Sequence, residues 1–388
     1  MTTTIDNEQK TLNVPNLRFP EFEGEWQENY VNEICNEFKS GKAIKADLIL
    51  DVGTYPVFGG NGLRGYTSTY NHDGLFVLIG RQGALCGNVR SVIGKTYITE
   101  HAIAVNGNNK SDTNFLHYLF LQMDLGRFSD QSAQPGLAVN KLLKLKVITP
   151  RIDEQRKIAN LLRLLDERIA TQNKIIDKLQ SLIKGLNNSL YAQYCHEVLT
   201  SFAKLGTSYS GLSGKSAQDF GSGKPFITYL NVYSNNIIND KDFQYVSIKD
   251  GEKQNVVEYG DVLFTLSSET PEEVGIGSVY LGKEKVYLNS FCFGIHIINT
   301  EVVFPPYLSY YVSSTSFRKF IYPYAQGSTR FNLCKADFEK ACIKLPSLEN
   351  QKRIYSVLCH ITSKVETEKS LLDFYNAQKQ YLLRQMFI

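Results

Sequence analysis

The chain carries one pattern twice, because Pro150 recurs as Pro346 and Gln155 as Gln351, an offset of 196 residues. The matched positions are identical or conservatively exchanged: Pro150, Gln155, Lys157, Ile158, Leu162, Leu165, Ile169 and Thr171 against Pro346, Gln351, Arg353, Ile354, Leu358, Ile361, Val365 and Thr367. A repeat of this length indicates a molecule built from two copies of one unit. We expect each copy to be a globular block followed by a long helix.

After each proline the apolar residues are spaced alternately by four and three, which is the heptad pattern of paired helices. The residues expected to pair the helices are Ile158, Leu162, Leu165 and Ile169 in the first copy and Ile354, Leu358, Ile361 and Val365 in the second. Both patterns carry a polar residue at the matching place, Gln172 and Glu368. This recurrence favours pairing of the two helices with each other over the alternative of two unrelated surface helices.

The first helix is predicted to run from Arg151 to Gln193, since proline is tolerated in a first helical turn and the acidic pair Asp153 and Glu154 favours a helix amino end. A helix of about 43 residues is roughly 64 Å long, so it would act as a spacer. The expected fold class is α+β, with two globular domains that alternate with two long helices that pair with each other in an internal repeat. The expected boundaries are a flexible segment 1–16, a first domain 17–149, a helical spacer 150–195, a second domain 196–345 and a helical spacer 346–388.

Length and composition support a chain of two folded domains. A chain of 388 residues is too long for one compact core, and a hydrophobic content of 43% excludes wholesale disorder. No apolar run reaches the roughly 18 residues of a membrane span, and the polar Met1–Lys10 does not read as a signal peptide. We expect a cytoplasmic protein that makes no contact with a membrane. The seven cysteines form no CxxC pair and are expected to be reduced. Cys292 and His296 alone do not make a zinc site, so no metal is predicted.

The net charge of +3 is too small to predict nucleic-acid binding by itself, so any basic footprint must be local. Six basic residues gather where the first block meets its helix: Lys141, Lys144, Lys146, Arg151, Arg156 and Lys157. Asp153 and Glu154 are expected to be the only opposing charges. The cluster fits a surface that faces phosphates or, equally, a solvated face.

In the first block, strand-like segments are broken by glycine turns that present donor side chains. Arginine can pair with guanine and asparagine or glutamine with adenine, although the same side chains can also simply cap turns. Each block closes with a glycine loop, Gln134–Asn140 or Gln326–Asn332, and the shared Gln, Gly and Asn of the two loops are the best-matched polar positions outside the helices. The residues predicted to contact DNA are Arg64, Arg81, Gln82, Asn88, Gln134, Asn140, Lys141, Gln326, Arg330 and Asn332.

Five motifs together resemble the specificity subunit of a type I restriction-modification system: Gly24–Trp26, Tyr55–Thr67, Arg81–Val89, Gln326–Asn332 and both P-x(4)-Q-x-x-I helix starts. The resemblance covers nearly the whole chain. It implies two target-recognition domains that each read one half of a split, asymmetric site in double-stranded DNA. It further implies that the two helices pack as an antiparallel coiled coil, in a pseudo-two-fold internal repeat, and set the gap between the halves. It also implies that two modification (methyltransferase) subunits dock on the chain and that restriction (motor-nuclease) subunits join them. This chain would bind no cofactor, while S-adenosylmethionine, ATP and Mg would bind the partner subunits.

Two other function classes were weighed against this interpretation. An enzyme is disfavoured because Phe304 replaces the hydrogen-bond acceptor that an amino-methyltransferase Pro-Pro motif needs, and no catalytic residues are predicted. A phosphate-binding loop at Gly214-Lys215-Ser216 lacks its first glycine, since that position is Tyr209. A coiled-coil adaptor that binds only protein would explain the helices, but it would have no reason to carry two blocks of glycine turns with polar tips.

Overall fold

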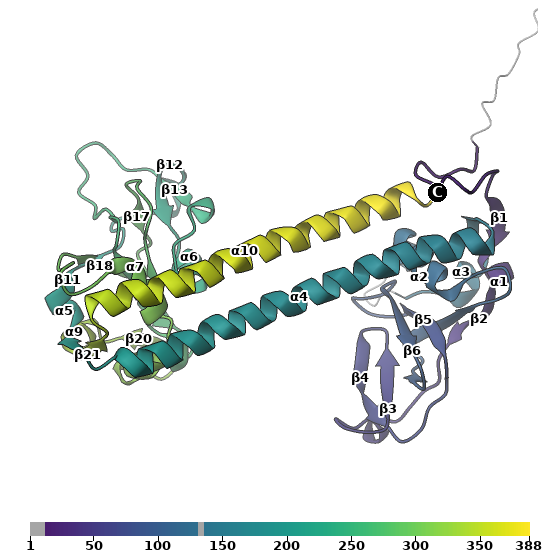
Figure 1. Cartoon of the computed structure of the whole chain (residues 1–388), viewed down its shortest axis with the longest axis horizontal. Helices are drawn as coiled ribbons and strands as arrows, with labels where there is room; N and C mark the ends of the chain where they lie inside the picture. Colours follow the sequence, from purple (N-terminus) through teal and green to yellow (C-terminus); the bar gives the residue numbers. More distant parts are fainter. Residues whose placement is uncertain (1–11, 131–135) are drawn as a thin grey trace, which may run out of the picture. The chain divides into compact units, whose positions relative to one another are not determined.

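The computed structural model describes residues 12–130 and 136–388 and divides the chain into two compact units (Figure 1). The first unit contains the residues up to Asn173 together with Ser370–Ile388, and the second contains Lys174–Lys369. Of the expected flexible segment 1–16, residues 1–11 lie outside the described part. Within the described ranges, no helix is both long and apolar enough to cross a membrane.

Two long helices contribute to both units: α4 (Ile152–Tyr194) and α10 (Leu348–Gln385). The first was predicted to span Arg151 to Gln193, and the prediction is confirmed to within one residue. Asn187 is a weak helix former, yet α4 continues through it. The buried Asn187 side chain donates a hydrogen bond of 2.7 Å to the backbone oxygen of Tyr310. This bond holds the late part of α4 against the globular fold of the second unit.

The first unit is a mixed fold around a four-stranded antiparallel sheet with the order β2-β8-β5-β6. A second sheet has the order β4-β3-β7, and β1 pairs with β9. Its elements are β1 (Gln27–Tyr30), α1 (Val31–Ile34), β2 (Cys35–Ser40), η1 (Ala46–Leu48), β3 (Tyr55–Gly59), β4 (Gly62–Thr67), β5 (Leu75–Gly80), β6 (Val89–Ile93), β7 (Tyr97–Ile98), β8 (Ala102–Gly107), α2 (Thr113–Gln122), η2 (Leu125–Phe128), α3 (Val139–Leu142) and β9 (Lys146–Thr149).

The second unit repeats this topology, with a central sheet β11-β18-β14-β16, a second sheet β13-β12-β17 and the pair β10-β21. It also contains the sheet β15-β20-β19. Its elements are β10 (Val198–Thr200), α5 (Phe202–Leu205), β11 (Gly206–Ser210), η3 (Ala217–Asp219), β12 (Phe220–Ile227), α6 (Tyr229–Ser234), η4 (Asp240–Asp242), β13 (Gln244–Val246), β14 (Val262–Thr265), β15 (Ser267–Ser268), η5 (Pro271–Glu273), β16 (Gly277–Val279), β17 (Tyr287–Leu288), β18 (Cys292–Ile297), α7 (Pro305–Tyr311), α8 (Thr315–Ile321), η6 (Tyr322–Tyr324), β19 (Ala325–Gln326), β20 (Phe331–Leu333), α9 (Lys335–Lys340) and β21 (Ile343–Leu345).

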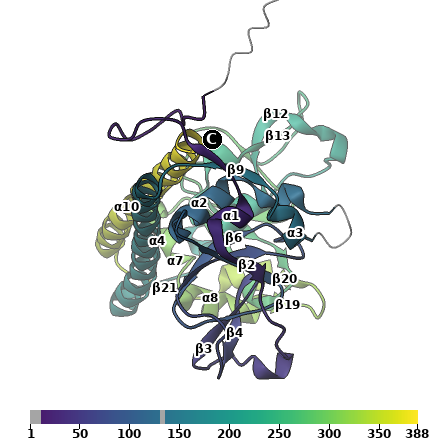
Figure 2. The same ribbon diagram turned by 90° about the vertical axis from the view of Figure 1, so that its right-hand side faces the viewer.

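The central strand β5 is a continuous apolar run because both of its faces are buried. Val77 and Ile79 pack into the core that contains α2 and the start of α4. Phe76 and Leu78 point to the other face and pack with Ile98 of β7. The β3–β4 hairpin therefore lies across the central sheet from α2, as Figures 1 and 2 show.

The expected helix pairing is present in each unit. In the first unit Ile158, Leu162 and Leu165 of α4 share one core with Leu382 and Met386 of α10. An ion pair of 2.6 Å between Asp166 and Lys379 joins the same two helices. The early part of α4 thus meets the late part of α10, which makes the pairing antiparallel.

In the second unit the late part of α4 meets the early part of α10. Ile183, Leu186 and Leu190 pack against the core that contains Ile354 and Leu358. The antiparallel coiled coil and the α+β fold class are therefore confirmed, and the alternative of two unrelated surface helices is wrong.

The repeated glutamines fix each long helix to the globular fold that precedes it. The amide of Gln155 donates to the backbone oxygens of Pro150 and Lys110, and its carbonyl accepts from Ser111 Oγ and the amide of Asp112. Gln351 repeats the arrangement: its amide donates to the backbone oxygens of Pro346 and Val302, and its carbonyl accepts from the amide of Phe304. Both glutamines are fully buried, so the repeated motif is a structural clamp.

Candidate nucleic-acid interface

Three backbone segments of the first unit meet just beyond the end of the central strand β5. The amide of Arg81 donates to the oxygen of His101, and the amide of Leu137 donates to the oxygen of Arg81, both at 2.9 Å. Gln82 also forms a bridge with Gly136, and its side-chain oxygen lies 3.1 Å from His101 Nδ1. We call this arrangement of residues 81–82, 99–101 and 136–137 the first ladder.

The second unit builds the same arrangement beyond the equivalent strand β14. The amide of Leu266 donates to the oxygen of Phe291 at 2.9 Å, and the amide of Leu333 donates to the oxygen of Leu266 at 2.8 Å. Ser267 pairs with Asn332 between β15 and β20. Residues 266–267, 289–291 and 332–333 form the second ladder, so each unit carries one copy of the same backbone construction.

The ladders correct the predicted match between the two glycine loops. Leu137 and Leu333 occupy the same place and differ by 196 residues, as the long helices do. Asn332 therefore corresponds to Gly136, and the match of Asn140 with Asn332 is wrong. Asn140 is exposed in α3, while Gln134 lies outside the described residues.

The β3–β4 turn brings further arginines to the first ladder. A Cβ built on Gly60 would lie 2.7 Å from the backbone oxygen of His101, so only glycine lets this turn approach so closely. A Cβ on Gly59 would lie 2.9 Å from Cδ of Arg64, and one on Gly62 would overlap the guanidinium of Arg90. Arg64 and Arg90 therefore extend along a turn that contacts the ladder.

Asn88 closes the loop that leads from β5 to β6. Its backbone oxygen accepts from Gly80 at 2.8 Å, and its amide donates to Leu85 at 3.1 Å. The side chain is half-buried, so the backbone of Asn88 shapes the loop that carries Arg81 and Gln82.

In the second unit the three predicted residues belong to one hairpin, formed by β19 and β20. Gln326 pairs with Asn332, and Arg330 lies in the connecting loop; all three side chains are exposed. Tyr229 donates to the backbone oxygen of Ser267 at 2.9 Å and so supports the second ladder from α6. Burial raises the pKa of the Tyr229 hydroxyl, which favours its role as a neutral donor.

The expected basic cluster is largely paired with carboxylates. Lys146 binds Glu28 and Lys141 binds Asp130, both at 2.7 Å, while Lys157 pairs with Glu21. The expectation that Asp153 and Glu154 supply the only opposing charges is therefore wrong, because the chain brings in carboxylates from distant segments. Exposed pairs of this kind contribute little to stability, so phosphates could replace the carboxylates at little cost.

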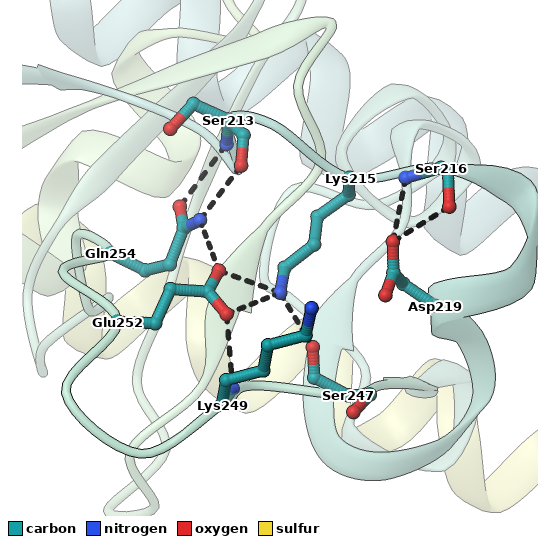
Figure 3. Close-up of polar contacts among 8 residues, drawn as sticks. All are labelled: Ser213, Lys215, Ser216, Asp219, Ser247, Lys249, Glu252 and Gln254. Atoms are coloured by element: carbon teal, nitrogen blue, oxygen red, sulfur yellow. Dashed lines mark hydrogen bonds and ion pairs between the residues drawn. The ribbon is translucent and has the colours of Figure 1, made fainter.

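Lys215, weighed above as part of a phosphate-binding loop, is already engaged in a polar network of the second unit (Figure 3). Its side chain is 6% exposed and donates to Glu252 and, at 2.6 Å, to the backbone oxygen of Ser247. Gln254 extends the network by bonding the backbone of Ser213. The hydrogen bond from Lys215 is the main cause that lowers the pKa of Glu252 to about 2. The network joins two loops, and its lysine is not free to bind phosphate.

Cys292 and His296, which do not make a zinc site by sequence, have other contacts in the structure. Cys292 is fully buried, which raises the pKa of its thiol, and His296 Nδ1 lies 2.9 Å from the buried carboxylate of Asp261. Among the residues that the structure describes, no three His, Cys, Asp or Glu side chains gather in a way that could hold a metal ion.

Comparison with known proteins identifies the fold. Residues 23–181 and 212–373 both match the model of the type I restriction modification DNA specificity domain. The chain therefore contains this domain twice, and the two matches together include most of its residues. The chain belongs to this family.

Individual relatives agree with this assignment over parts of their length. A type I restriction enzyme EcoprrI specificity subunit from Escherichia coli is 42% identical over 154 residues, which are 39% of this chain and 38% of that protein. A putative type I restriction enzyme MjaX specificity subunit from Methanocaldococcus jannaschii is 26% identical over 295 residues, 67% of this chain and 64% of that one. The chain thus spans less than two thirds of the length of these relatives.

Solved structures support the fold. The S subunit of a type I restriction-modification system from M. genitalium aligns with a TM-score of 0.63 at 16% identity, over 97% of this chain and 99% of that one. A chain from a study of complex assembly and conformational transition of the type I R-M system aligns with a TM-score of 0.57 at 15% identity, over 95% and 98%.

Against this family background, sequence reasoning found part of each ladder and missed the rest. It selected Arg81 and Gln82 of the first ladder and Asn332 of the second, but neither His101 nor Phe291. No side-chain signal marked these two residues, because Thr99 and Asn289 begin the same backbone turn with different side chains. The backbone oxygen of each accepts from the amide of the third following residue at 3.0 Å. That turn becomes visible only when the two copies are aligned by their strands.

Proposed function

We propose that this chain is the DNA sequence-specificity subunit of a type I restriction-modification complex and that it is not itself catalytic. It would bind a bipartite, asymmetric site in double-stranded DNA, with one half read by each recognition domain. The observation that carries the proposal is the ladder, which is built twice on the same backbone plan with different side chains. We place base contacts at Arg64, Arg81, Gln82, Asn88, Asn140 and Lys141 in the first domain and at Gln326, Arg330 and Asn332 in the second, with Gln134 as a further candidate in the first.

Two different ladders in one chain favour a split asymmetric target. Arg81 and Gln82 offer hydrogen bonds to base edges in the first domain, whereas Leu266 and Ser267 stand at the same places in the second. Each domain spans only a few base pairs, so its own affinity is weak. Joining two readers in one chain makes the second contact intramolecular and multiplies affinity, so losing either one should abolish specific binding.

Exposed apolar residues on the long helices support a scaffolding role. In the first unit Leu371, Phe374 and Tyr381 of α10 are 37%, 62% and 58% exposed. In the second unit Leu182 and Val357 are 46% and 48% exposed. These residues flank the pairing seam and do not form it, so they remain available to partner helices.

We propose that two modification subunits dock on these helix faces and that restriction subunits join the resulting complex. S-adenosylmethionine, ATP and Mg would act on those partners, with no cofactor held by this chain. The assembly would work in the cytoplasm, where its DNA lies.

The test is genome-wide mapping of adenine methylation in cells that express this chain with its matched modification subunit. The wild type should produce one split motif, and the double variant Arg81→Ala, Gln82→Ala should lose it. Lys110→Ala, at the opposite end of β8 from His101, is the matched control and should keep the motif.

The same experiment separates the proposal from its rival, a protein-binding coiled-coil adaptor. The adaptor is favoured by the same exposed apolar residues on α10. A continuous motif would refute the two-reader mechanism, and the absence of any new motif would favour the adaptor.

A further inference from the structure

The two ladders differ most in chemistry at one equivalent place, where the first has His101 and the second has Phe291. In both, the backbone oxygen accepts from the residue that follows the central strand at 2.9 Å. We infer that Phe291 is a specificity-determining residue that contacts the C5-methyl group of a thymine in the major groove. This inference rests on the proposed DNA-reading function and adds the chemistry of one base position to it.

Two hydrogen bonds fix the backbone of Phe291. Its amide donates to Asn289 Oδ1 at 2.9 Å, and its oxygen accepts from Leu266, so the backbone is fixed on both sides. The side chain is nevertheless 57% exposed. Isolated exposed apolar residues are common and need no explanation. The position of Phe291 in the ladder distinguishes it from the others.

The neighbours of Phe291 are groups that suit base edges. Phe291, Leu266 and Leu333 lie on three adjacent backbone segments, and adjacent strands are about 4.8 Å apart. The exposed Asn332, next to Leu333, is thus about 10 Å from Phe291, a span of roughly three base pairs. One apolar side chain and one amide would address base pairs about three steps apart in the same half-site.

The chemistry of the groove selects the target of Phe291. A phenylalanine side chain neither donates nor accepts hydrogen bonds. In the major groove the thymine methyl is the apolar group that a base edge presents. Insertion of the ring between base pairs as a wedge is disfavoured, because the ring is partly packed and its backbone is fixed within the ladder.

The first ladder offers the contrasting chemistry at the same place. His101 lies 3.1 Å from Gln82 Oε1, and its Nε2 lies 3.4 Å from Glu100. This polar group can read a base only through hydrogen bonds. The equivalent positions of the two half-sites should therefore be read by a polar group in one and by an apolar group in the other.

The experiment uses the assembled complex and a duplex that carries the methylation motif determined for the wild type. Each thymine of the motif, on either strand, is replaced in turn by uracil, which lacks only the methyl group. One replacement should weaken wild-type binding by about fourfold, the equivalent of one buried methyl group. With Phe291→Ala that replacement should have no effect, whereas Phe291→Leu should retain sensitivity to it.

Ile298→Ala is the matched control. Ile298 is 71% exposed and follows the opposite end of β18 from Phe291, so this variant should show the wild-type sensitivity. The inference is overturned if the wild type tolerates uracil everywhere or if Phe291→Ala remains sensitive at the same thymine. In either case a split wild-type motif would leave the proposed function standing. If the wild type produces no split motif, the proposed function fails and this inference fails with it.

Discussion

Replacing Gln155 with leucine should destabilise the first unit strongly, because this side chain joins α4 to the globular fold. Leucine keeps a high helix propensity and a similar size, but it can neither donate nor accept. Gln155 is 0% exposed, and the substitution leaves its former partners without hydrogen bonds.

The magnitude follows from the burial of those partners. The bonds to Ser111 Oγ and to the Pro150 oxygen are buried, and each buried polar group left unpaired costs about 1 to 3 kcal/mol. The bonds to Asp112 and Lys110 are partly buried, so water recovers much of their loss. We expect a loss of about 2 to 6 kcal/mol, a large share of the roughly 5 to 15 kcal/mol of a typical domain.

Urea unfolding followed by tryptophan fluorescence measures this loss of unfolding free energy in the first unit. Trp26 is the single tryptophan of the chain, and it is 3% exposed in the core of the first unit. A chain of two units need not unfold in one step, so a local probe is preferable to circular dichroism alone. Gln351→Leu should lower the midpoint seen by circular dichroism more than the midpoint reported by Trp26.

Asn173→Leu, an exposed change on the same helix within the first unit, is the control and should stay within about 0.5 kcal/mol of the wild type. A loss of less than about 1 kcal/mol for Gln155→Leu would refute the clamp, because even one unpaired buried group costs that much.

Two further predictions concern the polar network and a glycine turn. The pKa of Glu252 is lowered in the folded state to about 2 from its ordinary 4.5, so its contribution to stability is complete above pH 4.5 and is lost as the pH falls towards 2. Lys215→Met should flatten that acid dependence in urea titrations followed by circular dichroism, and identical profiles for variant and wild type would contradict the coupling. Gly87→Ala should cost more than Gly83→Ala in Trp26-monitored unfolding, because both have positive φ but only a Cβ on Gly87 would overlap neighbouring backbone. Gly83→Ala should lose about 1 to 2 kcal/mol from strain alone, and an equal loss in both variants would refute the role of the close approach.

The long helices could be predicted from sequence because their signal is local and periodic. Each heptad position of the first pattern, from Ile158 to Leu190, is buried or half-buried in α4. The offset between the two copies also located both glutamine clamps, although their hydrogen bonds reach loops such as the one around Lys110 that sequence did not connect to them.

The ladders could not be predicted, because their bonds join segments far apart in the chain. Arg81 meets His101 and Leu137 through backbone atoms, and backbone atoms leave no side-chain pattern to read. Matching the glycine loops by their shared residue types paired Asn332 with Asn140, which lies four positions from its structural equivalent Gly136. The 196-residue offset of the helices gives the correct pair. The prediction of the charges that oppose the basic cluster was wrong for the same reason, since Glu21 and Glu28 approach the cluster only after folding.

Because main-chain bonds hold each ladder together, its exposed side chains, such as Gln82, Phe291 and Asn332, are spared most structural duty. Arg81 and Leu266 make the same two backbone hydrogen bonds although one is charged and the other apolar. Substitution at the exposed positions of a ladder should alter stability by only a few tenths of a kcal/mol, as at an ordinary surface site. A lineage could therefore exchange one target sequence for another by single mutations, each passing through a folded and assembled intermediate.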